Sequence, residues 1–191
     1  MVLGTLYYYP AFPRSGWLVP LAKYLQLEIT AKSSAESAEF SSLFMLKRTP
    51  AFISENGFKL TEMIAIALYF VQKSDKKEFA GVTDEEKALQ VKWLSFFNSD
   101  VITSAFALAR ASTEEEKLKS SAKLEANLAF VDDQLSKTKF LSGETPLVSD
   151  MFAYVLFTVM KDYNLKIENS PNIDRYIDEL KVHPLGKLVD V

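Results

Sequence analysis

Hydrophobic residues follow different periods in the two halves of the chain. In the first eighty residues, short aromatic and β-branched runs alternate with segments whose apolar residues recur every three to four positions, which indicates strands alternating with helices. The Asn56-Gly57 pair between two short runs favours a tight hairpin. We therefore predict strands at residues 4–9, 27–31, 50–53 and 58–60, and helices at residues 18–27, 34–44 and 61–72, the last one capped by Thr61.

After residue 83 the pattern is helical throughout. Thr83 and Thr113 are each followed three positions later by a glutamate, which is the spacing of a helix capping box. Helices are expected at residues 84–110, 114–137, 149–163 and 171–182. The predicted fold class is therefore α/β plus all-α. A thioredoxin-like domain of β-α-β-α-β-β-α order occupies residues 1–74, a polar linker residues 75–82, and an all-helical domain residues 83–191.

Composition narrows the possible functions. Of the 191 residues, 48% are hydrophobic and 25% charged, which is the balance of a soluble globular protein. The net charge of −3 argues against non-specific binding of nucleic acid. The absence of cysteine excludes disulfides and thiolate ligands, and the single histidine, His183, is expected to be structural, so we expect no metal site. The longest apolar runs are too short to cross a membrane, and no secretory leader is visible, so we expect a cytoplasmic protein.

Three positions in the first domain carry residues suited to ligand binding. Pro50 opens a strand, which fits either an ordinary trans proline or a cis bond that turns the Thr49 backbone toward an extended peptide ligand. Glu62 starts an apolar helix, where a carboxylate either complements the helix dipole or meets a ligand ammonium. Arg14 and Ser15 end a proline-rich loop and are either solvated or able to stabilise a thiolate.

Together these features resemble the glutathione transferase superfamily. The thioredoxin-like half, the Thr-Pro pair before the hairpin, the Thr-Glu pair at the third helix and the all-helical second half carry the resemblance. A closer match is to one branch, the N-terminal transferase-like domain of translation elongation factor 1 gamma. That match covers essentially the whole chain and rests on residues 4–7, 46–52, 60–62, 65–66, 140–144, 150 and 171–176, and above all on the W-x-S-x-x-N-S-D stretch at residues 93–100.

The resemblance implies a glutathione transferase fold and glutathione as ligand or substrate. It assigns the γ-glutamyl ammonium to Glu62, the α-carboxylate to the Met63 amide and the cysteinyl amide to the Thr49 backbone before a cis Pro50. The glycine carboxylate is assigned to Arg48, or to the lysine that precedes it.

Residues for thiol activation and for structural roles complete the list of candidates. Ser15 and Arg14 are the catalytic candidates, with the neighbouring tyrosines as further options. Trp93, Asp100 and Asp150 are expected to be structural, with Asp100 acting as a buried charged partner.

Departures from the family pattern affect the expected site. Met63 stands where the family has a serine whose hydroxyl holds the α-carboxylate. One lost hydrogen bond costs about tenfold in affinity, so weak glutathione binding is expected. Leu147 replaces a capping Ser or Thr before Asp150, and Tyr176 stands in place of a tryptophan.

Three functions are compatible with these observations. The main hypothesis is a scaffold of elongation factor 1 gamma type that binds the nucleotide-exchange subunit during translation elongation. The alternatives are an active glutathione transferase and an interaction domain of an aminoacyl-tRNA synthetase complex. A homodimer is also expected, because Phe58, Phe70 and Phe97 are not obviously needed by either core.

Overall fold

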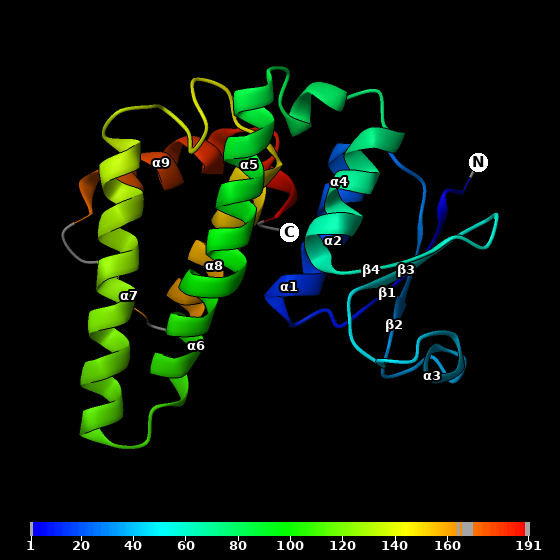
Figure 1. Ribbon diagram of the computed structural model, residues 1–191, viewed down its shortest axis with the longest axis horizontal. Coiled ribbons are helices and arrows are strands. Elements are labelled where there is room, and N and C mark those ends of the chain that lie inside the picture. The colour runs from blue at the N-terminus through cyan, green and yellow to red at the C-terminus, as the bar shows by residue number, and fades with distance from the viewer. Residues whose placement is uncertain (1, 164, 166–169, 190–191) are drawn as a thin grey trace. The chain divides into compact units, whose positions relative to one another are not determined.

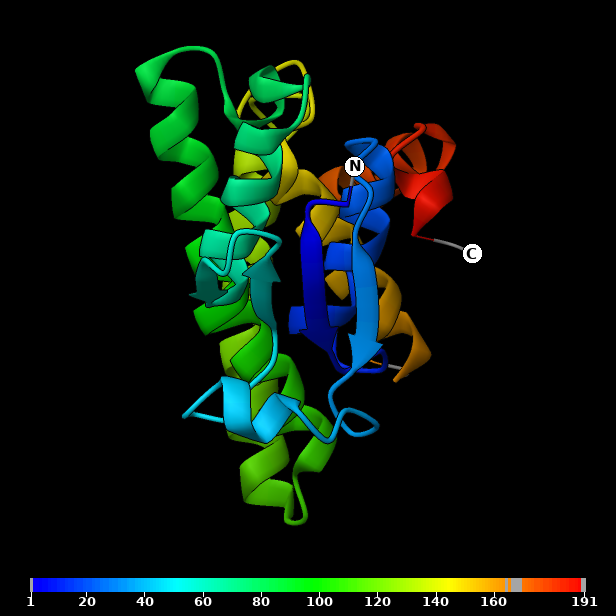
Figure 2. The ribbon, with the colours of Figure 1, turned by 90° about the vertical axis from the view of Figure 1, so that its right-hand side faces the viewer.

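In the computed structural model, which describes residues 2–163, 165 and 170–189, the chain divides into two units, one ending at Ala80 and one beginning at Gly81 (Figure 1). The first unit contains a four-stranded sheet of order β2-β1-β3-β4 (Figure 2). Strand β1 is parallel to β2 and antiparallel to β3, which pairs antiparallel with β4. The strands span Gly4–Tyr8 (β1), Thr30–Ser33 (β2), Ala51–Ser54 (β3) and Lys59–Thr61 (β4).

Helices pack on both faces of this sheet. They are α1 (Pro13–Gly16), α2 (Leu18–Tyr24), α3 (Phe40–Leu43) and α4 (Met63–Lys73). Leu6 lies opposite Phe52 in the β1–β3 ladder, and the Phe52 ring meets Phe70 of α4 edge-on at 5.2 Å, so this face is covered by α4. The neighbouring pair, Tyr7 and Ala51, points to the other face. There Tyr7 packs with Phe40 and with the following aromatic residue at position 44.

Three local predictions in this unit need correction. Only Phe40–Leu43 is helical within the predicted helix 34–44, because the residues before it form backbone turns, in which the Glu36 and Phe40 N–H groups donate to carbonyls three positions earlier. The second strand starts at Thr30, because Leu27 still donates its N–H to a carbonyl at the end of α2. Thr61 does not cap α4: it pairs with β3 as the last residue of β4, and Glu62 takes the cap position.

The predicted linker, residues 75–82, contains a short helix. The segment after α4 forms a short 3-10 helix, η1 (Lys77–Ala80), whose Phe79 is buried against the Tyr24 ring at a centroid distance of 4.9 Å. Lys76 lies 3.9 Å from the centre of the same ring and donates to the Tyr24 carbonyl at 2.8 Å. These contacts fix η1 to α2 of the first unit.

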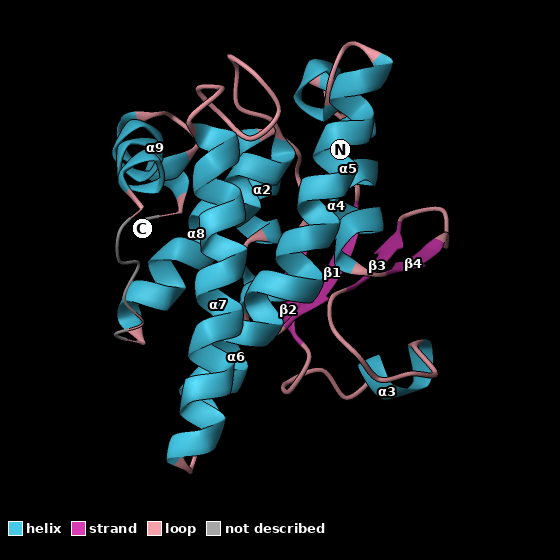
Figure 3. Cartoon of the chain, turned by 60° about the vertical axis from the view of Figure 1, so that its left-hand side comes forward, coloured by secondary structure: helices cyan, strands magenta, loops and turns pink. Residues whose placement is uncertain are grey.

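The second unit is helical (Figure 3). It contains α5 (Asp84–Phe96), α6 (Ile102–Arg110), α7 (Glu114–Leu135), α8 (Val148–Asp162), α9 (Pro171–Val182) and η3 (Gly186–Leu188). Both predicted capping boxes are confirmed: Thr83 and Thr113 each exchange hydrogen bonds with the glutamate three positions later. The predicted helix 84–110 is interrupted by a π-helical turn, η2 (Phe97–Val101). In a π-helix the backbone hydrogen bonds join residues five positions apart instead of four.

A buried carboxylate joins α8 to its neighbours in this unit. Asp150 is fully buried and accepts hydrogen bonds from the N–H groups of Leu141 (3.0 Å) and Leu147 (2.8 Å) and from the Tyr176 hydroxyl (2.9 Å). Burial raises the pKa of Asp150 to about 6, although the three donors pull it down. Tyr176 therefore replaces the expected tryptophan with a hydroxyl that serves Asp150.

Two of the three aromatic residues on which the expected homodimer was based belong to the core. Phe70 and Phe97 are fully buried core residues, whereas Phe58 is 47% exposed. Phe97 packs edge-on against Phe157 of α8 at 5.8 Å, which explains its burial within its own unit. Of the three, only Phe58 remains as a surface residue.

Candidate functional site

The sheet register brings three candidate segments to one end of the first unit. Tyr7 pairs with Ala51, and Ala51 pairs with Thr61. The end of β1, the start of β3 and the end of β4 therefore lie side by side. This end of the sheet adjoins three segments: the loop that follows β1, the Thr49-Pro50 pair that leads into β3, and the start of α4. We call it the sheet-end site.

The loop after β1 is closed by hydrogen bonds. The Ser15 hydroxyl donates to the Tyr9 carbonyl (2.9 Å) and accepts from the Tyr9 N–H (3.1 Å), and Ser15 is fully buried. The Phe12 N–H donates to the same Tyr9 carbonyl at 3.0 Å. Gly16 approaches Pro10 so closely that an added Cβ would collide with the Pro10 carbonyl oxygen. The sequence-predicted Ser15 thus lies at the site, with its hydroxyl turned into the loop.

Arg14 is presented by this loop on the single turn α1. Its guanidinium lies 5.7 Å from the centre of the Phe12 ring. Partial burial lowers the pKa of Arg14, and the charge of the Glu62 carboxylate raises it. The sheet register places the loop that carries Arg14 at the same end of the sheet as Glu62, so two of the predicted site residues from distant parts of the sequence share this end.

Glu62 and the start of α4 form the second part of the sheet-end site. Glu62 is exposed and has φ 73° and ψ 124°, a sparsely populated conformation for a residue other than glycine. Such conformations cluster at ligand-binding positions, where the surrounding structure holds them. Its carboxylate makes no capping bond to α4. The first N–H groups of α4, starting at Met63, have no acceptor within the helix and suit an anion.

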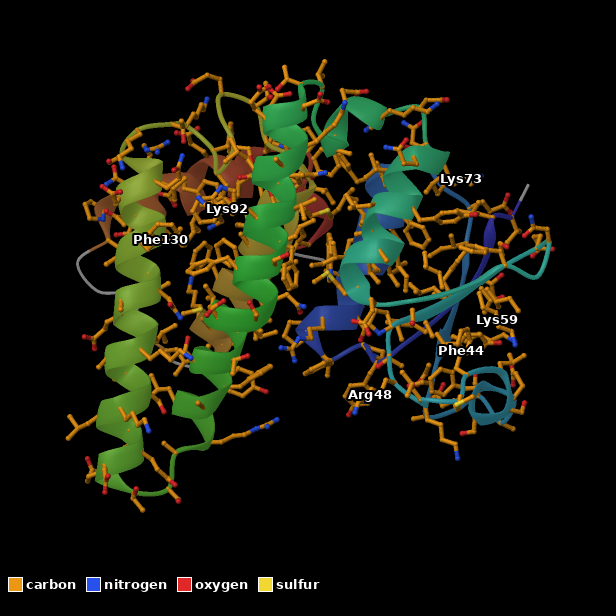
Figure 4. All side chains as sticks on the ribbon, viewed as in Figure 1. Phe44, Arg48, Lys59, Lys73, Lys92 and Phe130 are labelled. Carbon is orange, nitrogen blue, oxygen red and sulfur yellow. The ribbon has the colours of Figure 1, made fainter. Side chains whose placement is uncertain are left out.

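The third part is the approach to β3. The Thr49-Pro50 peptide bond is cis, which confirms the prediction. Thr49 is half-buried and Pro50 is buried, whereas Lys47 is exposed. Arg48 is exposed as well (Figure 4). Two cations thus precede the strand at the same end of the sheet as Glu62.

The residues predicted to be structural lie in the second unit. Trp93 is buried and packs against Phe97 and against Phe130 of α7, whose ring also faces Lys92 at 5.1 Å (Figure 4). Asp100 lies on the π-helical turn and is half-buried, accepting from the Ser99 hydroxyl at 2.7 Å. It is not the buried charged partner that we expected.

Sequence reasoning missed two features of the site. The interaction between Arg14 and Glu62 joins residues almost fifty positions apart and has no local signal. The closed loop did have a signal: a serine five residues after a Tyr-Pro pair and followed by glycine fits a loop that folds back on itself.

His183 follows the last residue of α9, and its Nδ1 accepts a hydrogen bond from the Leu185 N–H at 3.2 Å, in keeping with a structural role.

Two negative findings limit the chemistry within the described part of the chain. No group of three or more metal-ligating side chains is found there. None of the helices described is long and apolar enough to cross a membrane.

Comparison with known proteins gives consistent matches along the chain. The family model for the glutathione S-transferase N-terminal domain matches residues 4–72, and the model for the C-terminal domain matches residues 85–184. Glutathione S-transferase Y-2 of Pichia kudriavzevii is 39% identical over 189 residues, covering 98% of this chain and 99% of that protein. A crystal structure of a glutathione S-transferase from the same yeast superposes with a TM-score of 0.86 at 40% identity, covering 99% of this chain and 94% of the other.

Elongation factor proteins also match. Elongation factor 1-gamma 2 of Saccharomyces cerevisiae is 30% identical over 206 residues, covering 98% of this chain and 48% of that protein. The crystal structure of the GST-like domain of elongation factor 1-gamma from the same yeast has a TM-score of 0.82 at 24% identity, covering 100% of this chain and 94% of that domain.

Proposed function

Because the chain belongs to the glutathione S-transferase family, we propose that it is an active glutathione transferase. It binds glutathione at the sheet-end site and joins the glutathione sulfur to an electrophile. The single observation that carries this proposal is the 39% identity to glutathione S-transferase Y-2 over nearly the full length of both proteins. The alternative function of the sequence analysis thereby replaces its main hypothesis.

The binding roles follow from the charges of the sheet-end site. Glu62 takes the γ-glutamyl ammonium, and the first amides of α4, starting with Met63, take the α-carboxylate. The Thr49 backbone pairs with the cysteinyl amide as an added strand would. Arg48 takes the glycine carboxylate, because it is an exposed cation at the same end of the sheet. These assignments use glutathione alone and need no metal.

Thiol activation needs a hydrogen-bond donor or a cation beside the sulfur, because the thiolate is the nucleophile. Ser15 is poorly suited, since its one hydroxyl proton is donated to the Tyr9 carbonyl. Tyr8 and Tyr9, at the end of β1, bring phenolic donors to the same region, and half of Tyr9 is exposed. We therefore propose a tyrosine hydroxyl, rather than Ser15, as the donor that stabilises the thiolate.

The reaction is then a substitution at the electrophile. The thiol proton leaves to solvent, and the thiolate attacks the electrophilic carbon. A carbon–sulfur bond forms while the bond to the leaving group breaks, and the leaving group departs with its electron pair. No oxidant or reductant is required.

A second candidate function rests on the similarity to elongation factor 1-gamma 2. In that function the chain acts as a cytoplasmic scaffold that binds the nucleotide-exchange subunit, with weak glutathione binding. The replacement of the family serine by Met63 fits weaker binding. We also propose a homodimer for either function, as expected from the sequence.

One pair of assays separates the two candidates. The purified chain is tested for retention on immobilised glutathione and for conjugation of a chlorodinitrobenzene, and in parallel for capture of the exchange subunit. Retention with glutathione-dependent turnover supports the enzyme. Capture of the exchange subunit without turnover supports the scaffold and removes the first proposal.

A further inference from the structure

The hydroxyl of Ser15 sits in a position that a thiol-activating group cannot use. It is fully buried, donates to the Tyr9 carbonyl at 2.9 Å and accepts from the Tyr9 N–H at 3.1 Å. A serine hydroxyl has one proton, so donation to a thiolate would leave the Tyr9 carbonyl without this partner. Breaking a buried hydrogen bond in this way is unfavourable.

The same hydroxyl closes the loop that carries Arg14. Ser15 joins residues 9 and 15, and the Ser15 and Gly16 N–H groups both donate to the Phe12 carbonyl at 2.9 Å. The close approach of Gly16 to Pro10 leaves no room for a side chain there. The turn α1 has only four residues, so these hydrogen bonds span its whole length and hold the backbone on both sides of Arg14.

Arg14 and Glu62 together match the two charges of an α-amino-acid head group. The carboxylate of Glu62 suits the ammonium, and the guanidinium of Arg14 can hold a carboxylate with two parallel hydrogen bonds. Met63, which stands beside Glu62, offers no polar side chain for that carboxylate. Arg14 is thus suited to supply the interaction that a hydroxyl at position 63 would make.

From this geometry we infer that Ser15 is a positioning residue: its buried hydroxyl holds the loop closed and thereby fixes Arg14 at the same end of the sheet as Glu62, where Arg14 binds the γ-glutamyl carboxylate of glutathione. The inference rests on the proposed glutathione binding. It changes the roles of two residues, since Arg14 becomes a binding residue and Ser15 acts through it. Neither is needed for proton removal from the thiol.

The test compares Ser15→Ala, Arg14→Ala and the double variant by calorimetric titration with glutathione. Each single variant should raise the dissociation constant on the order of tenfold, as expected for a hydrogen bond to a charged group. The double variant should bind no more weakly than Arg14→Ala, because Ser15 acts through Arg14. Additive losses would overturn the inference.

The matched control is Ser74→Ala. Ser74 is also a buried serine of the first unit, and its hydroxyl likewise donates to a carbonyl, that of Val71 (2.8 Å), and accepts from an N–H, that of Lys76 (3.1 Å). Its replacement should leave glutathione affinity unchanged. If Ser74→Ala weakens binding as much as Ser15→Ala, the effect is general destabilisation and the inference fails. Ser15→Cys, which keeps the volume and weakens the donor, replaces Ser15→Ala if that variant does not fold.

A pH titration separates positioning from catalysis. Thiolate absorbance of bound glutathione should titrate at the same pH in wild type and Ser15→Ala. A thiol pKa that rises in Ser15→Ala at unchanged affinity would identify Ser15 as the activating hydroxyl and overturn the inference.

A ligand-free measurement distinguishes failure of this inference from failure of the proposed function. The coupling between Arg14→Ala and Glu62→Ala is measured by urea unfolding, with and without Ser15→Ala. Coupling that disappears with Ser15→Ala supports positioning even if wild type binds no glutathione, in which case only the proposed function fails. Coupling that persists overturns the positioning role.

Discussion

Asp150 offers a quantitative test of the packing of the helical unit. Its carboxylate is fully buried and accepts three hydrogen bonds, yet burial outweighs them and raises its pKa from the ordinary value of 3.8 to about 6. That difference corresponds to a free-energy cost of about 3 kcal/mol for carrying the charge in the folded protein at neutral pH. Replacement by asparagine removes the titration but also turns an amide donor toward backbone N–H groups.

The sign of the pH dependence follows from proton binding. Between the two pKa values the folded protein binds more protons at Asp150 than the unfolded chain, so this contribution to stability is complete below about pH 4 and is lost as the pH rises through about 6. The pKa of Tyr176 is raised far above this range by burial and by Asp150, so its hydroxyl remains a donor. Titrations shared by both proteins cancel in the difference between wild type and Asp150→Asn.

Urea unfolding of wild type and Asp150→Asn from about pH 4 to pH 7 measures this difference directly. The stability advantage of wild type should shrink by about 2–3 kcal/mol over that range. Tyr176→Phe removes one hydrogen-bond donor that lowers the pKa of Asp150. The stability contributed by protonated Asp150 should therefore persist to higher pH in Tyr176→Phe than in wild type. An advantage of wild type that stays constant or grows with pH would refute the reasoning that burial dominates at Asp150.

Three further changes test other parts of the account. Asp132 of α7 accepts two backbone N–H groups at the start of α9 at 2.9 and 3.0 Å, so Asp132→Ala should lower the free energy of unfolding by about 1–2 kcal/mol in urea. Asp100→Ala should change it by less than about 1 kcal/mol, because Asp100 is half-buried; a larger loss would restore the buried-partner hypothesis. Gly16→Ala should weaken glutathione binding on the order of tenfold by calorimetry, since its Cβ would strike the Pro10 carbonyl and displace the loop; unchanged affinity would contradict the closed-loop description. Light scattering should give a dimer at micromolar concentration, and a mass near 21.6 kDa would contradict it.

Much of the fold could be predicted from local sequence signals. Thr83 and Thr113 marked two helix starts because a capping box is a contact between residues three apart. Asn56-Gly57 marked the hairpin for a similar reason. The errors arose where long-range contacts determine the secondary structure. Thr61 carries a side chain suited to helix capping, but it pairs with β3 and is therefore the last residue of a strand.

The site was harder to predict from the sequence than the fold. Residue types identified Glu62 and Arg14 as candidates, but their proximity depends on how the loop after β1 meets the start of α4. The direction of the Ser15 hydroxyl could not be read from composition, since an inward serine and a ligand-facing serine look alike in sequence. The burial of Asp100 was overestimated, because the π-helical turn on which it lies has no simple sequence pattern.

The central claim is that the sheet-end site binds glutathione for transfer to an electrophile. The most direct measurement is steady-state conjugation of a chlorodinitrobenzene as a function of glutathione concentration, with wild type, Glu62→Ala and the control Glu55→Ala at the exposed hairpin turn. The account predicts saturable turnover in wild type and Glu55→Ala, and a KM for glutathione at least about tenfold higher in Glu62→Ala, as for the loss of a bond to a charged group. Absence of turnover in folded wild type, or equal KM values in all three proteins, would contradict it.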